Sequence, residues 1–196
     1  KHVVTANKAL LSAHGEEIFR AAQKRGVDVL FEAAVGGSIP IIRALRESLG
    51  TSAIRSIYGI LNGTCNYILT RMTDDGASYD EMLKAAQQLG FAERNPVADV
   101  SGKDSLQKLV ILARLAFGAS LSPEEILCEG IERITPMDIS FAQELGYRIK
   151  LLAIAKEREG RIEARVHPAM IPLSGLMANV KFEYNAIEVV GEEFGT

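Results

Sequence analysis

The 196-residue sequence is poor in the residue types that build metal and disulfide sites. Its two cysteines, Cys65 and Cys128, lie far apart and form no Cys-x-x-Cys pair. This spacing argues against both a structural zinc site and a disulfide framework, so we expect two reduced thiols. The three histidines, His2, His14 and His167, share no His-Glu-x-x-His spacing, and a histidine-based metal site is not expected.

A strong charge imbalance and long apolar runs are also lacking. The chain has 22 Lys and Arg residues against 25 Asp and Glu residues, a net charge of −3, so non-specific binding to nucleic acid is not expected. No window approaches 18 consecutive apolar residues, and the N-terminus carries no signal-peptide pattern. We therefore expect no membrane contact and a cytoplasmic location. A hydrophobic content of 47% is typical of a globular domain with one good core.

Fingerprint motifs for common cofactors and nucleophiles are missing as well. The sequence contains no Gly-x-Gly-x-x-Gly and no Gly-x-x-x-x-Gly-Lys-[Ser/Thr] segment, so it carries no dinucleotide-binding or phosphate-binding loop of its own. Neither a nucleophile elbow nor a Cys–His arrangement is visible. The chain starts at Lys1 and enters a strand-like run directly, which predicts a piece of a longer protein.

Hydrophobic periodicity predicts an α+β fold, a mixed β-sheet with helices packed on one face. The pair Ser78 and Glu81 forms a capping box, and Thr135-Pro136 marks another helix start. Strands are expected at 3–5, 27–35, 54–60, 147–155, 161–171 and 181–190, with a turn at 156–160 in the hairpin. Helices are expected at 9–25, from Ser38 to Gly50, after Asn62, and at 78–90, 102–117 and 135–146.

The most informative stretch runs from Phe91 to Lys108 and places an acid and a base on one expected helix. Asp104 and Lys108 are four residues apart, a spacing that an ordinary surface ion pair also has. The helix is apolar on both sides, because Ile111 and Leu115 continue the stripe of the pair and other apolar residues lie opposite. Charges at the start of such a helix line a cleft or pair with each other, so we expect both side chains to point inward.

This pair suits acid–base chemistry on a polar substrate. A partly desolvated Lys108 is able to exchange a proton near neutral pH, while Asp104 and Glu93 are suited to hold an ammonium or a hydroxyl. Glu93 and Asp99 lie in a proline-containing loop, and a helix-dipole or loop-solvating role is the alternative for both. A hydrolase that uses Glu93 and Asp104 as paired carboxylates needs no lysine, which makes that interpretation less attractive.

Two kinds of segment lie where ligands bind in α/β sheets. Lys8 follows the first expected strand at its carboxyl end, and a solvated lysine at a helix start is the alternative. Gly36-Gly37 permits close approach of the backbone to an ion, and a plain tight turn is the alternative. The segment Asn62-Gly63-Thr64 has the same ambiguity.

Several long motifs occur in an order that matches one known family. They are VTANKALL (4–11), FEAAVGGSIPIIRALRE (31–47), GILNGTCNYILTRM (59–72), the segment 93–108, ITPMDISFAQELGYRIKLLAIA (134–155) and ARVHP (164–168). Over almost its whole length the chain resembles homoserine dehydrogenase. The resemblance implies an oxidoreductase that interconverts L-homoserine and L-aspartate 4-semialdehyde with NADP or NAD, in the biosynthesis of threonine, methionine and isoleucine. It also implies a homodimer.

The resemblance assigns a role to each candidate residue. It makes Lys108 the proton donor and Lys8 a cofactor contact. Phe91 stands where a tyrosine is also found in the family, which removes one substrate hydroxyl contact. The implied substrate-binding residues are Glu93, Asp104, Asp99, Gly63 and Thr64. The implied site for a monovalent cation such as Na⁺ consists of Glu32 and the carbonyl groups of Val35, Gly37 and Ile39.

The resemblance also divides the chain into two parts. Residues 1–26 are expected to be the last strand and helix of a Rossmann-type nucleotide-binding domain, and residues 27–196 the catalytic, substrate and dimerisation domain. Because the glycine fingerprint is missing, we expect the isolated chain to be inactive. The alternative is a non-catalytic substrate-binding and dimerisation core, in which strands 147–155 and 181–190 pair with a second copy.

Overall fold

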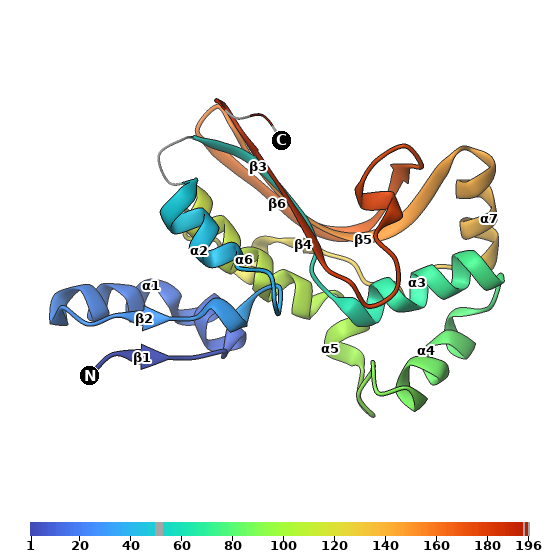
Figure 1. Ribbon diagram of the computed structural model, residues 1–196, viewed down its shortest axis with the longest axis horizontal. Coiled ribbons are helices and arrows are strands. Elements are labelled where there is room, and N and C mark those ends of the chain that lie inside the picture. The colour runs from blue at the N-terminus through green and yellow to red at the C-terminus, as the bar shows by residue number, and fades with distance from the viewer. Residues whose placement is uncertain (50–52, 194, 196) are drawn as a thin grey trace.

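Two β-sheets organise the chain, and the computed structural model describes residues 1–49, 53–193 and 195. Within these residues the smaller sheet has two parallel strands, and the larger has five strands in the order β4-β6-β5-β3-β7 (Figure 1). The strands are β1 (Val3–Val4), β2 (Val29–Leu30), β3 (Ile54–Ile60), β4 (Leu127–Cys128), β5 (Tyr147–Arg158), β6 (Arg161–Pro172) and β7 (Ala186–Gly191). The helices are α1 (Lys8–Arg25), α2 (Ile41–Arg43), α3 (Gly63–Asp75), α4 (Tyr79–Gln88), α5 (Val97–Val100), α6 (Lys103–Phe117) and α7 (Pro136–Glu144). Shorter helical turns lie at Glu32–Ala34, Ala44–Ser48, Pro123–Glu125 and Met177–Asn179.

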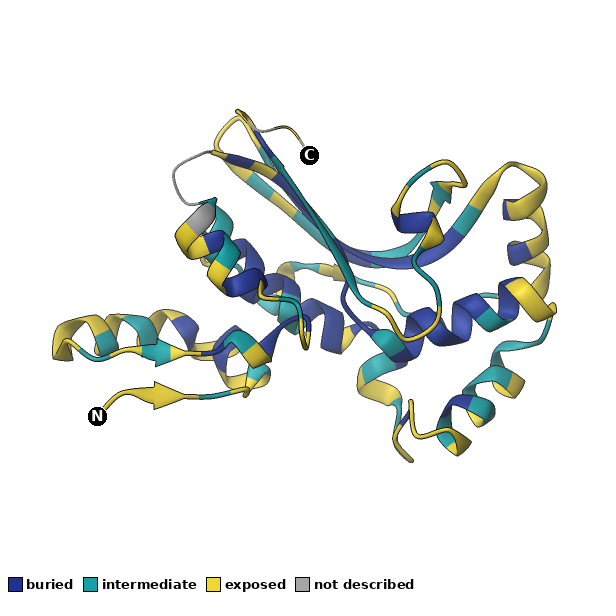
Figure 2. Cartoon of the chain, in the orientation of Figure 1, coloured by how far each residue is buried: buried dark blue, intermediate teal, exposed yellow. Residues whose placement is uncertain are grey.

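The larger sheet is mixed and carries the main core on its helical face. β3 pairs antiparallel with β5 and β7, β5 pairs antiparallel with β6, and β4 runs parallel to β6. Alternate residues of β5, among them Ile149, Leu151 and Ala153, join the core beneath α3, α6 and α7. Figure 2 shows this buried layer in dark blue along α6, α3 and the sheet. The expectation of a mixed sheet with helices on one face is confirmed.

The helix boundaries follow from the capping residues. Ser78 and Glu81 form the predicted capping box at the start of α4, and Thr135 forms a second one with Asp138 at α7. Gly26, with φ of 58°, ends α1 in the left-handed conformation that glycine adopts readily. These three helices lie close to their predicted positions. The predicted stop of the second helix at Gly50 falls outside the described residues.

The predicted strand at 27–35 is wrong over most of its length. Only β2 is extended, and the chain then turns into the short helical segment Glu32–Ala34. The turn brings the Glu32 carboxylate to the start of α2, where its two oxygens accept hydrogen bonds from the Ile42 and Arg43 amides at 2.8 and 2.9 Å. This helix therefore begins at Ile41 rather than at the predicted Ser38. The Glu32 carboxylate caps it, because one carboxylate satisfies two free amides at once.

Two other strand predictions need correction in their details. The first strand covers only Val3–Val4 of the predicted 3–5. These two residues are 47% and 81% exposed, since a two-stranded sheet is too narrow to cover them. The hairpin strands extend to Arg158 and from Arg161, which leaves a tight turn at 159–160 in place of 156–160. Both turn residues have positive φ, as in the type I′ turn that commonly joins two hairpin strands.

The last strand is shorter than predicted, and two short elements were not predicted. β7 begins at Ala186, because residues 181–185 form a loop that bonds to α3 in place of a neighbouring strand. The helix α5 and the strand β4 have four and two residues and show too little periodicity to be recognised in the sequence. α5 lies in the proline-containing loop that carries Asp99.

Candidate active site

The lysine and the carboxylate predicted on α6 form a buried ion pair. Lys108 Nζ lies 2.7 Å from Asp104 Oδ2 and donates a second hydrogen bond to the Leu61 carbonyl at 2.6 Å. The two side chains are 15% and 8% exposed, so the pair points inward as the apolar flanks of α6 predicted. Lys8, at the start of α1, reaches the other oxygen of Asp104 at 3.1 Å. Lys8 and Lys108, which are 100 residues apart in the sequence, therefore both contact the Asp104 carboxylate.

Asn62 joins this pair to a second carboxylate. Its side-chain amide donates to Asp104 Oδ2 at 2.9 Å and to Asp99 Oδ1 at 2.8 Å. Its side-chain oxygen accepts the Cys65 amide at 2.8 Å and so caps α3. The sequence predicted that Asn62 lies in a turn with Gly63 and Thr64, but it gave the Asn62 side chain no role, although asparagine is a preferred residue at a helix start. All hydrogen-bonding groups of the Asn62 amide are used inside the site.

The two aspartates have pKa values shifted in opposite directions. Burial opposes ionisation of Asp104, but Lys108, Asn62 and Lys8 together outweigh it and hold its pKa below the ordinary value. Burial raises the pKa of Asp99, and the charge of Asp104 acts in the same direction, while the Asn62 hydrogen bond opposes both. The site thus holds one firmly ionised carboxylate beside one that protonates more readily.

The predicted residues Gly63 and Thr64 lie at the start of α3, next to Asn62. Thr64 Oγ1 donates to the Phe91 carbonyl at 2.5 Å, and the Phe91 ring packs on the Tyr67 ring with centroids 4.9 Å apart. A Cβ at Gly63 would lie 2.5 Å from the Glu183 carbonyl oxygen, so only glycine fits. The turn is held between two segments that are distant in the sequence.

Glu93 is the predicted substrate residue with the weakest link to this cluster. Its side chain is exposed, and its backbone carbonyl accepts a hydrogen bond from Gln87 at 3.2 Å. Its negative charge contributes to the raised pKa of Asp99, which places it within electrostatic range. A substrate-binding role for Glu93 therefore stays a prediction.

The expected cation site has oxygen donors of a suitable kind. Gly36 and Gly37 both have positive φ, which allows the chain to turn tightly between Glu32 and Ile39. The Glu32 carboxylate already accepts two amides, and the Ile39 carbonyl accepts the Ile41 amide at 2.8 Å. Carboxylate and carbonyl oxygens are the ligands that hard cations prefer, so the donors suit such an ion. Elsewhere, no three acidic, histidine or cysteine side chains group into a metal site within the described ranges.

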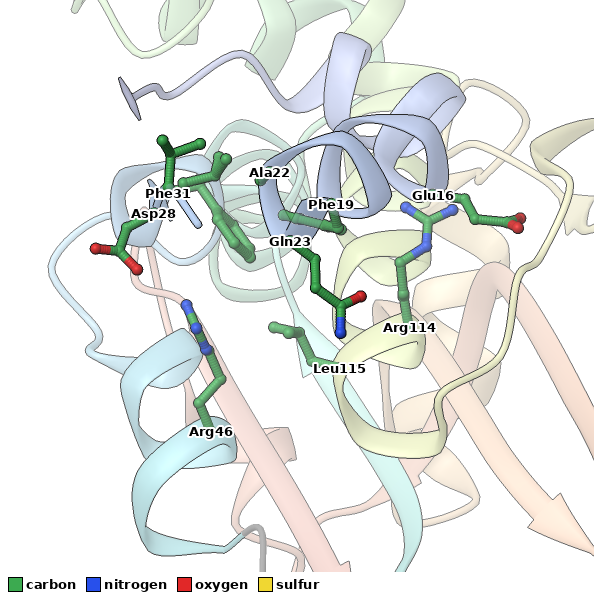
Figure 3. A pocket seen from close by; sticks show the side chains of 11 residues that line it. Glu16, Phe19, Ala22, Gln23, Asp28, Phe31, Arg46, Arg114 and Leu115 are labelled. Atoms are coloured by element: carbon green, nitrogen blue, oxygen red, sulfur yellow. The ribbon is translucent and has the colours of Figure 1, made fainter. Parts of the chain in front are cut away.

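A separate cavity of about 500 Å³ lies between α1, β2 and α6 (Figure 3). Asp28 and Arg46 point toward each other on one side of it, and Arg114 lies on the other side. Arg114 donates to the Leu11 carbonyl at 2.9 Å and so ties α1 to α6. Sequence analysis did not identify this cavity, and its lining includes none of the predicted site residues: it consists of Glu16, Phe19, Ala22, Gln23, Val27, Asp28, Val29, Phe31, Arg46, Arg114 and Leu115.

Comparison with known proteins decides the family. The family model for homoserine dehydrogenase matches residues 40–196. The chain belongs to the homoserine dehydrogenase family. A homoserine dehydrogenase of Synechocystis sp. is 52% identical over 100% of this chain, which covers 46% of that relative. The chain thus spans about half the length of the curated relatives that it matches.

Solved homoserine dehydrogenase structures have the same fold. The homoserine dehydrogenase of Thiobacillus denitrificans superposes with a TM-score of 0.97 at 53% identity, over 100% of this chain and 45% of that one. A hyperthermophilic archaeal homoserine dehydrogenase in complex with NADPH is 28% identical, with a TM-score of 0.84 over 99% of this chain and 56% of that one. The resemblance read from the sequence motifs and the predicted fold class are both confirmed. In the part of the chain that the structure describes, no helix has the length and apolarity needed to cross a membrane.

Proposed function

We propose that the protein to which this chain belongs is a homoserine dehydrogenase that interconverts L-homoserine and L-aspartate 4-semialdehyde with NADP or NAD. The convergence of Lys108, Asp104, Asn62 and Lys8 in a member of this family carries the proposal. The relative solved with NADPH supports a nicotinamide cofactor. When bound, that cofactor supplies or accepts the hydride at the carbon that is reduced or oxidised.

Lys108 is suited to protonate the oxygen of the semialdehyde as negative charge develops on it. An ammonium has three N–H groups, and two of them bond to Asp104 and the Leu61 carbonyl. The third is free to point at a substrate oxygen, and the ionised Asp104 keeps the lysine oriented. In the opposite direction Lys108 receives the hydroxyl proton of homoserine.

The carboxylates and the glycine turn form the substrate side of the proposed site. Asp104, Asp99 and Glu93 supply negative charge for the substrate ammonium, and Gly63 and Thr64 place the start of α3 beside it. Lys8 is 39% exposed at the start of α1, so it keeps donors available for the cofactor. These residues fit a nicotinamide cofactor at the end of β1, and Glu32 with the carbonyls of Val35, Gly37 and Ile39 is proposed to hold Na⁺.

We propose the division into a nucleotide-binding remnant and a catalytic domain with one adjustment. β2 pairs in parallel with β1, and α1 connects the two strands, as in a nucleotide-binding β-α-β unit. This pairing supports ending the first part at Leu30 rather than at residue 26. The isolated chain is proposed to be inactive, because most of a dinucleotide site is not encoded in it.

The homodimer also stays a proposal. Of the two strands expected to pair with a second copy, β5 is an interior strand and β7 is an edge strand, so β7 is the better candidate. A sedimentation experiment on the full-length protein tests this arrangement. The cytoplasmic location, the named amino-acid pathways and the lack of nucleic-acid and membrane partners remain predictions.

The first test is homoserine-dependent reduction of NAD⁺ and NADP⁺ by the full-length protein, followed by absorbance. Lys108→Ala is expected to lower kcat by about a hundredfold or more, because the proton donor is lost, while the Kd for the cofactor stays nearly unchanged. Lys103→Ala is the control, since Lys103 is an exposed lysine on the same helix. Wild-type turnover in the Lys108→Ala variant would show that this lysine is not the proton donor.

A further inference from the structure

One lysine outside the ion pair is completely buried. Lys150 lies in β5 with none of its surface exposed. Its ammonium bonds to three neutral oxygens: Asn66 Oδ1 at 2.8 Å, the Val180 carbonyl at 2.5 Å and Thr70 Oγ1 at 3.5 Å. Within the described residues no carboxylate lies within ion-pair distance of it. Burial of an ammonium without a counter-ion lowers the free energy of unfolding, so we expect this lysine to serve a function other than stability.

The three oxygens belong to two segments that Lys150 joins together. Asn66 and Thr70 lie one turn apart on α3, and Val180 begins the segment 180–185 that leads into β7. The same two segments share further hydrogen bonds: Asn66 donates to the carbonyls of Val180 and Tyr184, and the Phe182 amide donates to Thr70 Oγ1. Figure 1 shows this loop passing beside the start of α3. Lys150 is thus the centre of a clamp between α3 and residues 180–185.

The clamp reaches the proposed active site through the start of α3. The Glu183 carbonyl lies so close to Gly63 that no side chain fits between them. The backbone N–H of Asn66 donates to the backbone carbonyl of Asn62 at 3.1 Å. The Asn62 side chain in turn donates hydrogen bonds to both aspartates of the site. Movement of residues 180–185 away from α3 therefore removes the support from one side of the turn that carries Asn62.

We propose that Lys150 is a positioning residue for the dehydrogenase reaction: its ammonium clamps residues 180–185 onto α3 and thereby holds Asn62 and Gly63 in place for substrate binding. The inference rests on the proposed function. Three acceptors face the nitrogen, which matches the three donors of an ammonium, whereas a neutral amine has two. Loss of the proton removes one of the three bonds and loosens the clamp.

The surroundings of Lys150 cause its ammonium to lose a proton near neutral pH. Burial lowers its pKa from 10.5 to about 7. The charge of Arg148 on β5 acts in the same direction, Asp74 on α3 opposes it, and Lys181 in the clamped segment lowers the pKa further. Lys181 also pairs with Asp74 at 2.8 Å, which weakens the support that Asp74 gives to the Lys150 charge. We expect the clamp to be tight below pH 7 and looser above it.

Steady-state kinetics of the full-length enzyme test the catalytic half of the proposal. Lys150→Met is expected to raise the KM for homoserine about tenfold, because the substrate-side turn is no longer held. The wild-type KM is expected to rise as the pH passes about 7, and the variant KM to be high throughout without that step. Thr70→Val removes two bonds of the clamp and is expected to raise KM as well. Thr73→Val is the control, since the Thr73 hydroxyl bonds only to Leu69 within the same helix.

Amide hydrogen exchange gives a readout that does not depend on turnover. After correction for intrinsic rates, residues 180–185 of the wild type are expected to exchange faster at pH 8 than at pH 6, and those of Lys150→Met to exchange fast at both. Equal exchange in wild type and variant at both values overturns the clamp, even in an active dehydrogenase. A wild-type KM with a wild-type pH profile in both Lys150→Met and Thr70→Val overturns the positioning role. Exchange as expected in a protein without homoserine turnover supports the clamp and overturns the proposed reaction.

Discussion

Asn62 shows how a single side chain connects the chemistry of the site to the fold. Its oxygen completes a helix cap, and its two N–H groups divide between Asp99 and Asp104. The two carboxylates repel each other, and an amide donor between them lowers that repulsion. Removing the donor is therefore expected to change the protonation of the site more than its shape.

The variant Asn62→Asp separates these two tasks. It keeps an oxygen for the Cys65 amide but replaces both donors with a third negative charge. We expect a loss of about 1–3 kcal/mol in unfolding free energy, because the half-buried Asp99 and the buried Asp104 each lose one hydrogen-bond donor. We also expect a fall of about tenfold or more in kcat/KM. Asn7→Asp is the control, because Asn7 caps the exposed start of α1 in the same way. Denaturant unfolding and kinetics measure both effects, and equal losses in the two variants would contradict this role.

At the scale of residues, the sequence predicted the charged residues of the candidate site better than the hydrogen bonds that connect them. Lys108 and Asp104 were recognised because a helix that is apolar on both sides must bury its charges. Asn62 was noted only as part of a turn, since the sequence does not show whether the N–H groups of an N-cap asparagine face solvent or carboxylates. The burial of Lys150 was not recognised either, because a single lysine in an apolar strand is typical of a solvent-exposed edge position. Its burial depends on the segment 180–185, which is distant in the sequence.

At the scale of elements, local signals predicted the helices and tertiary contacts changed the strands. Caps and glycine stops are local, so α1, α4 and α7 lie close to where the sequence placed them. β2 ends early because Glu32 turns to cap α2, and β7 starts late because residues 181–185 bond to α3. In both cases the strand boundary is set by hydrogen bonds to another element. Hydrophobic periodicity within a segment gives no information about such contacts.

The start of α3 offers a prediction at this scale. Gly63→Ala places a methyl group 2.5 Å from the Glu183 carbonyl, so residues 180–185 or the helix start must move. We expect a higher KM for homoserine and a loss of about 1–3 kcal/mol in unfolding free energy. Gly76→Ala is the matched control at the other end of the same helix: its φ of 67° makes alanine unfavourable, but no atom lies within 4 Å of the new methyl group. A KM that changes equally in both variants would show that the effect is general destabilisation.

At the scale of the whole molecule, the proposed site lies where the small N-terminal unit meets the larger sheet. Lys8 comes from the small unit, and Asp104 and Lys108 come from the helix that packs on the large sheet. Arg114 fastens α1 to α6 near the same junction. The arrangement places the proposed cofactor contact and the proposed substrate residues on two separate units, so the packing of these units decides the geometry of the proposed site.

The buried Lys150 gives the final prediction, which concerns the stability of the whole fold. Its pKa is about 7 in the folded protein and near 10.5 when unfolded, so between these values the unfolded chain binds more protons. The free energy of unfolding must then rise with pH across this window, even though the clamp on residues 180–185 loosens. Lys150→Met removes the titrating group and with it this rise. Unfolding midpoints of both proteins in urea at pH 6, 7.5 and 9 measure the difference, and a wild-type minus variant difference that stays constant or falls with pH would show that Lys150 does not titrate in this window. A fold that accepts such a cost at neutral pH keeps the lysine for the position it enforces rather than for stability.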